Sequence, residues 1–563
     1  MAPLFMALEV AMDLAQPRLL QAIVDKGIAH HDLPLVWHTG LIMIGVALVG
    51  LVGGGGCTIF ATAASLNFGT AIRGKLFGKV QELSFGNLDR LQTGGLITRL
   101  TNDIDQVQES AAMFLRILVR TPLLAVGSLV MAIVTSPRLS LLLVIIGPLL
   151  ILLLVLANRR VHPLYTEVQE RLDRVNTVVQ ENLAGVRVVK AFGRGPYECD
   201  RFSTANERLC KQTVVASSFV AGTMPLMMLM LNLGIVGVIW FGGVSVHRGQ
   251  LHVGQLLAFI NYLLQMLFSL MMVGMMLMQV ARADASAERI IEVMESAPDV
   301  ADAPDALPAP AFAGKVAFDR VGFGYARDGG TDVLRDVSFS VEPGQTVTIL
   351  GATGSGKSTL VNLIPRLYDV TAGRITIDGA DVRSLTQSSL RSQIAMVMQE
   401  TILFSGTIRE NLRYCRPEAT DQEIEEAARI AQAHDFITGF AEGYDTSLGQ
   451  RGVNLSGGQK QRLSIARALV ARPAILIMDD CTSAVDMATE GKILAGLANW
   501  SHRCTRFVVA QRITSAVGAD KVLVIDDGAI AAEGTHEQLL QTSAIYRTIV
   551  ESQANGREVD DVE

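Results

Sequence analysis

The sequence has few charged residues for its length. Only 18% of its 563 residues are Asp, Glu, Lys or Arg, whereas 50% are hydrophobic, and the mean hydropathy is +0.35. This balance excludes an intrinsically disordered chain and is hard to reconcile with a wholly soluble protein. A chain of this length also exceeds what one hydrophobic core usually serves, so we expect two or three domains.

Three further patterns are missing. No two of the six cysteines form a Cys-x-x-Cys pair or have metal-ligand spacing, so we expect free thiols in a reducing compartment. The sequence has no large basic block, which argues against a nucleic-acid partner. The N-terminal segment lacks a basic start and is interrupted by Glu9 and Asp13, which argues against a secretory signal peptide.

The charges that are present divide the chain in two. Residues 1–295 contain 23 basic and 20 acidic residues, while residues 296–563 contain 25 and 35, and the net charge of the whole is −7. The first half is charge-poor and slightly basic, and the second has the composition of an ordinary acidic soluble domain. We therefore expect the two halves to fold in two different solvents.

Long uncharged windows in the first half predict membrane spans. Crossing about 30 Å of hydrocarbon takes roughly 20 mostly apolar residues. Five uncharged windows and one weaker candidate meet this length. The weaker candidate is residues 1–24, which contain Glu9, Asp13 and Arg18. Five windows without Asp, Glu, Lys or Arg each supply one span: 33–72, 121–137, 139–158, 212–247 and 249–281.

The connecting segments orient these spans. Residues 158–211 alone contain ten Lys or Arg, so the positive-inside rule places the long connectors in the cytoplasm and the tight turns outside.

Two features inside the predicted membrane spans leave alternatives open. The run Gly53–Gly56 allows either close helix packing or a gating hinge. Asp13 is either a contact for a cationic substrate or ion, or an acid that has a protein partner or faces the membrane interface.

One motif in the second half predicts a phosphate site. It matches G-x-x-x-x-G-K-[ST] in full and follows a β-branched run at 346–350, as a strand–loop–helix phosphate cradle requires. Lys357 should reach the β- and γ-phosphates, and the Ser358 hydroxyl should bind Mg²⁺. Asp479 ends a buried apolar run and should face the same metal. The motif and the residue after it are Gly351, Ala352, Thr353, Gly354, Ser355, Gly356, Lys357, Ser358 and Thr359.

A second glycine pair forms another candidate phosphate site. The stretch Leu455–Arg462 has the sequence Leu-Ser-Gly-Gly-Gln-Lys-Gln-Arg and comes just before a predicted helix. One nucleotide does not easily need two such loops from the same domain. Two domains that face each other head to tail would share them.

Together these motifs resemble the ATP-binding cassette (ABC) superfamily, and nearly the whole chain is similar to an exporter-type half-transporter. The resemblance implies an all-α polytopic membrane domain at 1–295, with six transmembrane helices and long cytoplasmic extensions. A linker at 296–314 and an α/β P-loop NTPase cassette at 315–563 follow. The stretches Thr93–Asp103 and Glu181–Phe192 resemble extensions that end in coupling helices and touch the ATPase domains.

The same resemblance assigns roles in the cassette. Tyr325 fits the aromatic residue that stacks on adenine, and Gln399 fits the Q-loop residue that senses Mg²⁺ and the γ-phosphate. The stretch Ser483–Asp486 fits the D-loop at the dimer seam. ATP and Mg²⁺ are the implied cofactors. The family's signature is matched by Ser456, Gly457, Gly458 and Gln459.

Three positions depart from the family pattern. Asp480 stands after the Walker B aspartate where competent sites have Glu, and Gln511 stands where the family has its switch histidine. Gln450 replaces a residue that is usually Glu. An amide cannot share a proton as imidazole does, and the Asp480 carboxylate is one methylene short. Either these substitutions are tolerated, or the site of Asp480, Gln511 and Gln399 is degenerate and hydrolyses ATP slowly.

A degenerate site beside an intact signature suggests a partner of a different kind. We expect one subunit of a heterodimeric exporter in the cytoplasmic membrane, whose signature completes the competent ATP site of a second, non-identical half-transporter. The substrate, a small molecule, lipid or peptide, is not identified by the sequence. An importer built on the same membrane fold and an ATP-gated channel or regulator remain alternatives.

Overall fold

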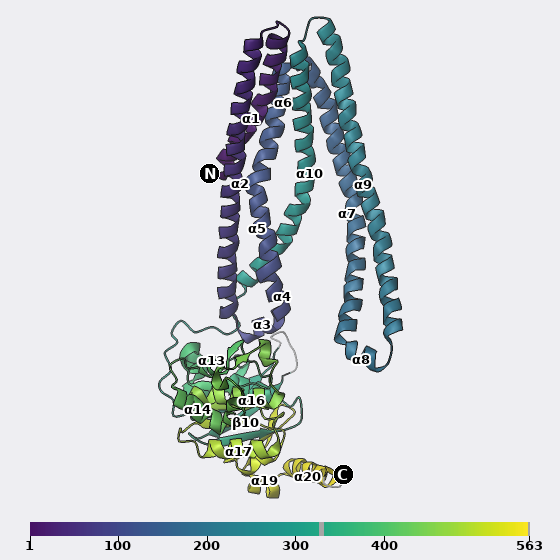
Figure 1. Cartoon of the computed structure of the whole chain (residues 1–563). Coiled ribbons are helices and arrows are strands. Elements are labelled where there is room, and N and C mark those ends of the chain that lie inside the picture. Colours follow the sequence, from purple (N-terminus) through teal and green to yellow (C-terminus); the bar gives the residue numbers. More distant parts are fainter. Residues whose placement is uncertain (326–331, 561–563) are drawn as a thin grey trace. The chain divides into compact units, whose positions relative to one another are not determined.

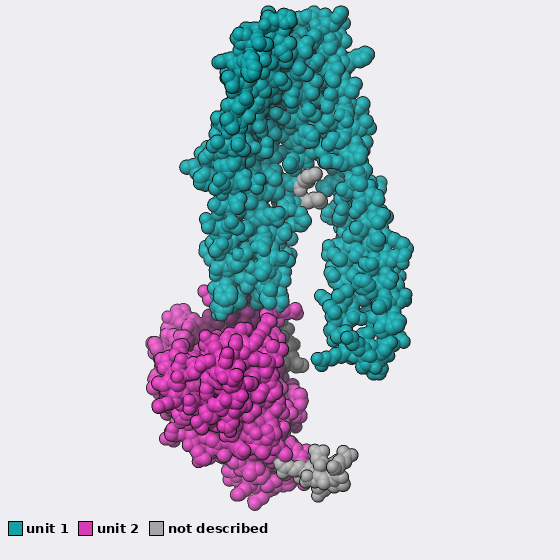
Figure 2. Space-filling model, in the orientation of Figure 1, with its two compact units in different colours: residues 1–81, 94–295 teal, residues 82–93, 296–563 magenta. Residues whose placement is uncertain are grey.

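The computed structural model describes residues 1–325 and 332–560, apart from the side chains of 274, 275, 277, 278, 281 and 554–560. Contacts divide the chain into two compact units, which Figure 2 shows in different colours. Unit 1 contains Met1–Gln81 and Gly94–Glu295, and unit 2 contains Glu82–Thr93 and Ser296–Glu563. The short segment Glu82–Thr93 therefore packs with the second half of the chain.

Unit 1 is entirely helical in the described residues. Its long helices follow from apolar sequence that is interrupted by short polar turns, such as Ser136, whose hydroxyl caps the helix that begins at Pro137. The helices and π-helical segments are α1 (Ala2–Ala22), η1 (Ile23–Ile28), α2 (Leu33–Glu82), α4 (Thr93–Thr98), η2 (Arg99–Asp103), α5 (Ile104–Met113), η3 (Phe114–Leu118), α6 (Val119–Thr135), α7 (Pro137–Ala184), α8 (Val186–Ala191), α9 (Gly195–His247) and α10 (Val253–Glu295).

Five helical stretches of unit 1 are long and apolar enough to cross a membrane, as the uncharged windows predict. The helix α1, the weaker sixth candidate, spans 21 residues but is not among the five, and it carries Glu9, Asp13 and Arg18. The five stretches are Leu33–Glu82, Thr93–Thr135, Pro137–Ala184, Gly195–His247 and Val253–Val273.

The glycine run of α2 is a packing surface for α1. A Cβ atom on Gly53 would lie 2.9 Å from the backbone oxygen of Phe5 and 3.0 Å from the backbone nitrogen of Glu9. A Cβ on Gly56 would lie 2.6 Å from the Phe5 ring, whereas Gly55 faces open space. The close approach of the two helices explains Gly53 and Gly56 by packing, the first of the two alternatives.

Polar groups of α1 find partners on neighbouring membrane helices. The Arg120 guanidinium forms ion pairs with Asp13 at 3.0 Å and with Glu9 at 3.3 Å. The Tyr262 hydroxyl of α10 donates to the backbone oxygen of Leu14 at 2.9 Å. Asp13 thus has a protein partner in Arg120, and α1 is fixed to both α6 and α10.

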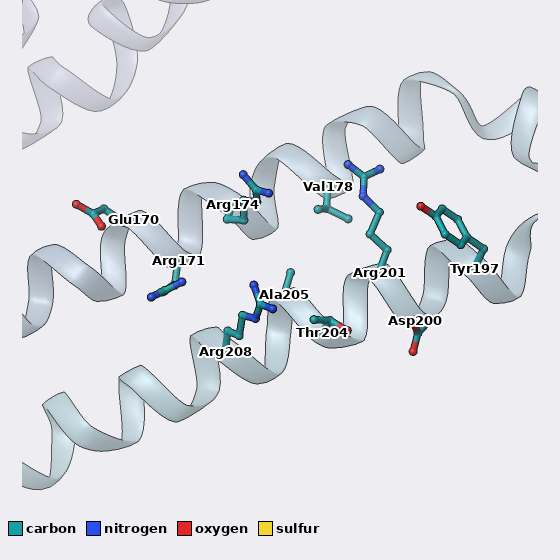
Figure 3. Close-up of a pocket in the computed structure, with 10 residues that line it drawn as sticks. All are labelled: Glu170, Arg171, Arg174, Val178, Tyr197, Asp200, Arg201, Thr204, Ala205 and Arg208. Atoms are coloured by element: carbon teal, nitrogen blue, oxygen red, sulfur yellow. The ribbon is translucent and has the colours of Figure 1, made fainter.

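The helices α7 and α9 form an antiparallel pair joined through α8, and Figure 1 shows them side by side over their length. Near α8 a cavity of about 650 Å³ lies between them, and basic side chains from both helices line it (Figure 3). Arg201 pairs with Glu181 there, and Arg171 pairs with Glu167. Four of the ten basic residues of 158–211, which the sequence predicts to be cytoplasmic, line this cavity: Arg171, Arg174, Arg201 and Arg208.

Unit 2 is an α/β domain built on three sheets in the described residues. A six-stranded sheet has the order β12-β11-β3-β10-β9-β6 and is parallel apart from β12; a four-stranded antiparallel sheet has the order β2-β1-β4-β5. The strands are β1 (Val316–Phe323), β2 (Leu334–Val341), β3 (Thr346–Leu350), β4 (Ala372–Ile377), β5 (Ala380–Asp381), β6 (Ile394–Val397), β7 (Gly406–Thr407), β8 (Ser447–Leu448), β9 (Ile475–Asp479), β10 (Thr505–Val509), β11 (Lys521–Asp526) and β12 (Ala529–Gly534).

Helices cover the parallel sheet because its central strands are buried on both faces, as the runs at 346–350 and 475–479 indicate. The helices and 3₁₀ turns of unit 2 are α3 (Phe85–Leu91), α11 (Lys357–Leu363), η4 (Val382–Ser384), α12 (Gln387–Arg391), α13 (Ile408–Arg413), α14 (Asp421–Ile430), α15 (His434–Thr438), η5 (Gly443–Asp445), η6 (Gln450–Gly452), α16 (Gly457–Val470), α17 (Met487–Ala498), α18 (Thr514–Val517), α19 (His536–Thr542) and α20 (Ala544–Asp560).

Candidate functional site

The loop between β3 and α11 has the backbone of a phosphate cradle. Gly351 has φ of 152° and a Cβ there would lie 2.2 Å from the backbone oxygen of Ile525, so no side chain fits. Gly356 has φ of 101° and forms the N-cap of α11, a conformation that favours glycine. The two glycines let the chain turn tightly. The backbone N–H groups at the start of α11 are then free to bind a phosphate.

Two side chains of this loop are suited to an anion. The Lys357 ammonium donates to the backbone oxygens of Gly351 and Ala352 at 2.9 and 2.8 Å. Burial lowers the pKa of Lys357, and the nearby Asp480 and Asp479 carboxylates raise it. Ser355 is 7% exposed, and its hydroxyl oxygen is buried with no hydrogen-bond partner among the described residues. An orphaned hydroxyl in a glycine-rich cradle fits a phosphate oxygen.

The pair of Ser358 and Asp479 forms an oxygen site beside the cradle. The Ser358 hydroxyl donates to Asp479 Oδ1 at 2.9 Å, and Asp479 is 5% exposed at the end of β9. Burial raises the pKa of the Asp479 carboxyl, while the hydrogen bond from Ser358 lowers it. A nearby divalent cation would favour the ionised carboxylate. Hydroxyl and carboxylate oxygens are ligands that Mg²⁺ prefers, so these residues fit the predicted metal.

The Asp480 carboxylate is held by two amides. Its Oδ2 accepts from Gln511 Nε2 at 2.7 Å and from Gln399 Nε2 at 3.2 Å. Burial raises the pKa of Asp480, and the hydrogen bond from Gln511 lowers it. The structure therefore brings together all three residues that the sequence predicts as the catalytic group. Both amides donate to the carboxylate and neither can take a proton from it.

A cavity of about 240 Å³ joins most of the predicted residues. The rest of the cradle, Gly351, Ala352 and Ser355, lies in the loop itself, and Tyr325 reaches the cavity through a hydrogen bond of 3.0 Å to Thr359. The predicted residues that line the cavity are Thr353, Gly354, Gly356, Lys357, Ser358, Thr359, Gln399, Asp479, Asp480 and Gln511.

The second glycine motif lies apart from this cavity. Ser456 caps α16 through a reciprocal capping box with Gln459, and a Cβ on Gly458 would lie 2.8 Å from the backbone oxygen of Ala484. The signature is thus packed against the stretch Ser483–Asp486. Among the residues that the structure describes, none of Ser456, Gly457, Gly458 and Gln459 lines the cavity. One copy of the cassette consequently presents the two phosphate motifs at separate places.

Two clusters near the site were not expected from the sequence. Tyr368 packs edge-on against Tyr325 with 5.3 Å between ring centroids, and its hydroxyl donates to Asp89 of α3 at 2.8 Å. The buried Glu490 accepts hydrogen bonds from Thr482 at 3.0 Å and from Arg512, next to Gln511, at 2.8 Å. Both clusters join segments far apart in the sequence, and no local pattern marks them.

Comparisons with known proteins agree with this architecture. Residues 1–270 match the family model for the ABC transporter transmembrane region, and residues 334–483 match the model named ABC transporter. The chain is 43% identical over 557 residues to the uncharacterized ABC transporter ATP-binding protein YfiB of Bacillus subtilis, with 99% of this chain and 96% of the relative covered.

One further relative and one solved structure are similar to this chain. It is 38% identical over 470 residues to a fatty acid ABC transporter ATP-binding/permease protein of Mycobacterium tuberculosis, covering 83% of this chain and 74% of that one. The solved structure of a bacterial Atm1-family ABC exporter with ATP bound is 29% identical and covers 98% of this chain and 97% of its own, with a TM-score of 0.82. The chain therefore belongs to the ABC transporter family, as an exporter-type half-transporter that joins a helical membrane domain to an ATPase cassette.

Proposed function

We propose that this protein drives export of a substrate across the cytoplasmic membrane as one subunit of a heterodimeric ABC transporter, and that its own ATP site is degenerate. The observation that carries the proposal is the Asp480 carboxylate, which is short and is held by the Gln511 and Gln399 amides. A base acts only when it reaches the water whose proton it takes. Here one of its two oxygens, Oδ2, already accepts from two donors that cannot relay a proton.

The other residues of the site are those of a nucleotide-binding cradle. Lys357 and the N–H groups of the loop bind the phosphates, and Ser358 with Asp479 holds Mg²⁺, which when bound neutralises phosphate charge. Tyr325, 53% exposed, offers its ring to adenine. Binding is therefore retained while the orientation of the attacking water is weakened.

The separation of the two glycine motifs supports a shared site. A signature that lies apart from its own cradle can meet a phosphate only in the cradle of a second cassette. In a heterodimer, Ser456–Gln459 of this chain would complete the partner's site, where a Glu and a His supply the chemistry. The intact signature is then retained for the partner's ATP. The transporter can then function despite a degenerate site at Asp480 and Gln511, because ATP turnover takes place at the partner's site.

Nucleotide retention tests the binding half of this proposal. The purified full chain, incubated with Mg²⁺ and ATP and passed rapidly through a desalting column, should keep nucleotide that is mostly still ATP. Lys357→Ala should abolish retention, whereas Lys492→Ala, a matched change at an exposed position of α17, should not. Rapid appearance of ADP on the wild-type chain contradicts the degenerate site. Equal retention by Lys357→Ala contradicts the cradle.

A further inference from the structure

A third cavity, inside the membrane half, has no role in the ATP site. It has a volume of about 520 Å³ and is formed by α1, α2, η3 and α6 of unit 1. Such a volume lies within the range of small-molecule sites. Its apolar wall includes Met6, Met12 and Leu51, and its polar wall consists chiefly of Glu9, Asp13, Arg116 and Arg120.

The cavity lies in the half of the membrane span that is remote from the tight turns. Arg116 and Arg120 are 19 and 15 residues before the end of α6 at Thr135, roughly 28 and 22 Å along a helix. Asp13 lies at a matching depth, since it is 15 residues, or roughly 22 Å, before the end of η1 at Ile28. Ionisable side chains within a membrane span are rare and mark functional sites by default.

The four charges divide into two poles. Arg120 pairs with both Asp13 and Glu9, so this triad has a net charge of −1. Arg116, one turn earlier, forms no ion pair among the described residues and adds a separate charge of +1. It belongs to the π-helical segment η3, a local irregularity that is frequent at functional sites. The cavity as a whole is neutral, with a negative pole at the Arg120 triad and a positive pole at Arg116, which is about 6 Å from Arg120 along the helix.

From these poles we infer that the cavity binds the headgroup of a zwitterionic amphiphile, which carries an ammonium and a phosphate or carboxylate on an apolar tail. A ligand with one charge would leave a net charge in a low-dielectric medium, whereas a zwitterion leaves none. Its ammonium faces Glu9 and Asp13, its anion faces Arg116, and its tail lies along Met6 and Met12. If the occupant is cargo, the inference rests on the proposed export function; binding alone does not.

Photolabelling with three probes tests the charge rule. The probes share one photoreactive acyl chain and differ in headgroup: phosphoethanolamine, phosphate or a quaternary ammonium. The full chain is labelled in nonionic maltoside micelles, which contain no competing charged headgroup, and without ATP, so that hydrolysis does not affect the result. The wild type should prefer the zwitterionic probe over both others by about 10-fold, which corresponds to about 1.4 kcal/mol.

Two substitutions should move this preference in opposite directions. Arg116→Gln leaves the cavity at −1 and should favour the ammonium probe, while Glu9→Gln leaves it at +1 and should favour the phosphate probe. Arg116→Lys keeps the charge and should keep the wild-type order. Arg18→Gln, an exposed arginine of α1 outside the cavity lining, is the matched control and should change nothing.

Loss of labelling by all three probes alike in both cavity variants would mean a purely structural role and overturn the inference. Equal labelling of the wild type by the three probes overturns it as well. ATP-dependent accumulation of the zwitterionic probe in inside-out vesicles, lost in Arg116→Gln, identifies the ligand as cargo. Labelling without accumulation, together with a zwitterionic lipid copurified from native membranes, identifies it as a resident lipid. Because labelling needs no ATP, it can succeed or fail independently of the proposed heterodimeric export.

Discussion

If the ATP site of this chain is degenerate as proposed, supplying a longer carboxylate and a histidine should activate it. The change is Asp480→Glu together with Gln511→His. In the wild-type chain, Asp480 Oδ2 lies 2.7 Å from Gln511 Nε2 and 3.2 Å from Gln399 Nε2. The glutamate would extend past these two donors toward the γ-phosphate, and the histidine would remove one of them and add a group that can share a proton.

The size of the effect follows from the added reach. One methylene moves the carboxylate by about 1.5 Å. A displacement of about 1 Å at a reacting group can cost on the order of 100-fold in rate. We therefore expect Mg²⁺-dependent ATP turnover by the purified chain to rise about 100-fold in the double variant, which corresponds to about 2.7 kcal/mol in the activation free energy.

The assay is steady-state phosphate release by the full chain in lipid nanodiscs. Asp435→Glu makes the same chemical change at an exposed position of α15 and should leave the rate unchanged. Nucleotide affinity, measured with a fluorescent ATP analogue, should change little because the cradle is untouched. Turnover that stays at the wild-type level in the double variant, with ATP binding intact, would show that Asp480 and Gln511 do not limit hydrolysis.

Further predictions concern packing, the buried acid and adenine. Gly53→Ala should lower the free energy of unfolding in detergent by about 1–3 kcal/mol, because its Cβ meets the α1 backbone, while Gly55→Ala, which faces open space, should be neutral in the same thermal assay. Glu490→Gln should lower the free energy of unfolding of the cassette, measured by urea denaturation, by about 1–3 kcal/mol. Glu490 is 3% exposed, but its partner Arg512 is 37% exposed, so solvent limits this loss of stability. Tyr325→Ala should weaken binding of a fluorescent ATP analogue by about 10-fold through lost stacking, and Tyr325→Phe should retain binding; equal loss in both would contradict stacking.

The architecture could be read from the sequence because its signals are local. Uncharged windows such as 33–72 and 139–158 predict membrane helices, and the comparisons confirm a helical membrane domain followed by an α/β cassette. The contiguous motif from Gly351 to Ser358 likewise predicts its own strand–loop–helix setting, which the structure has. The roles of Asp480, Gln511 and the signature stay predictions.

The remaining features were beyond the sequence because they depend on distant pairs. Asp13 and Arg120 are 107 positions apart, so the sequence left open whether the acid has a protein partner. The bond from Tyr368 to Asp89 joins positions separated by 279 residues and assigns the short helix α3 to the cassette unit. Helix periodicity and motif spacing carry no information about such contacts.

The most direct test of the heterodimer compares ATP turnover by this chain alone with turnover by the chain purified together with a co-expressed, non-identical half-transporter. We predict slow turnover for the chain alone and a large increase for the pair. The increase should be abolished by changing the partner's Walker B glutamate to glutamine, and it should survive Asp480→Asn in this chain. Robust turnover by the single chain, at about 1 s⁻¹ or faster as in ordinary enzymes, would contradict the heterodimer and the degenerate site together.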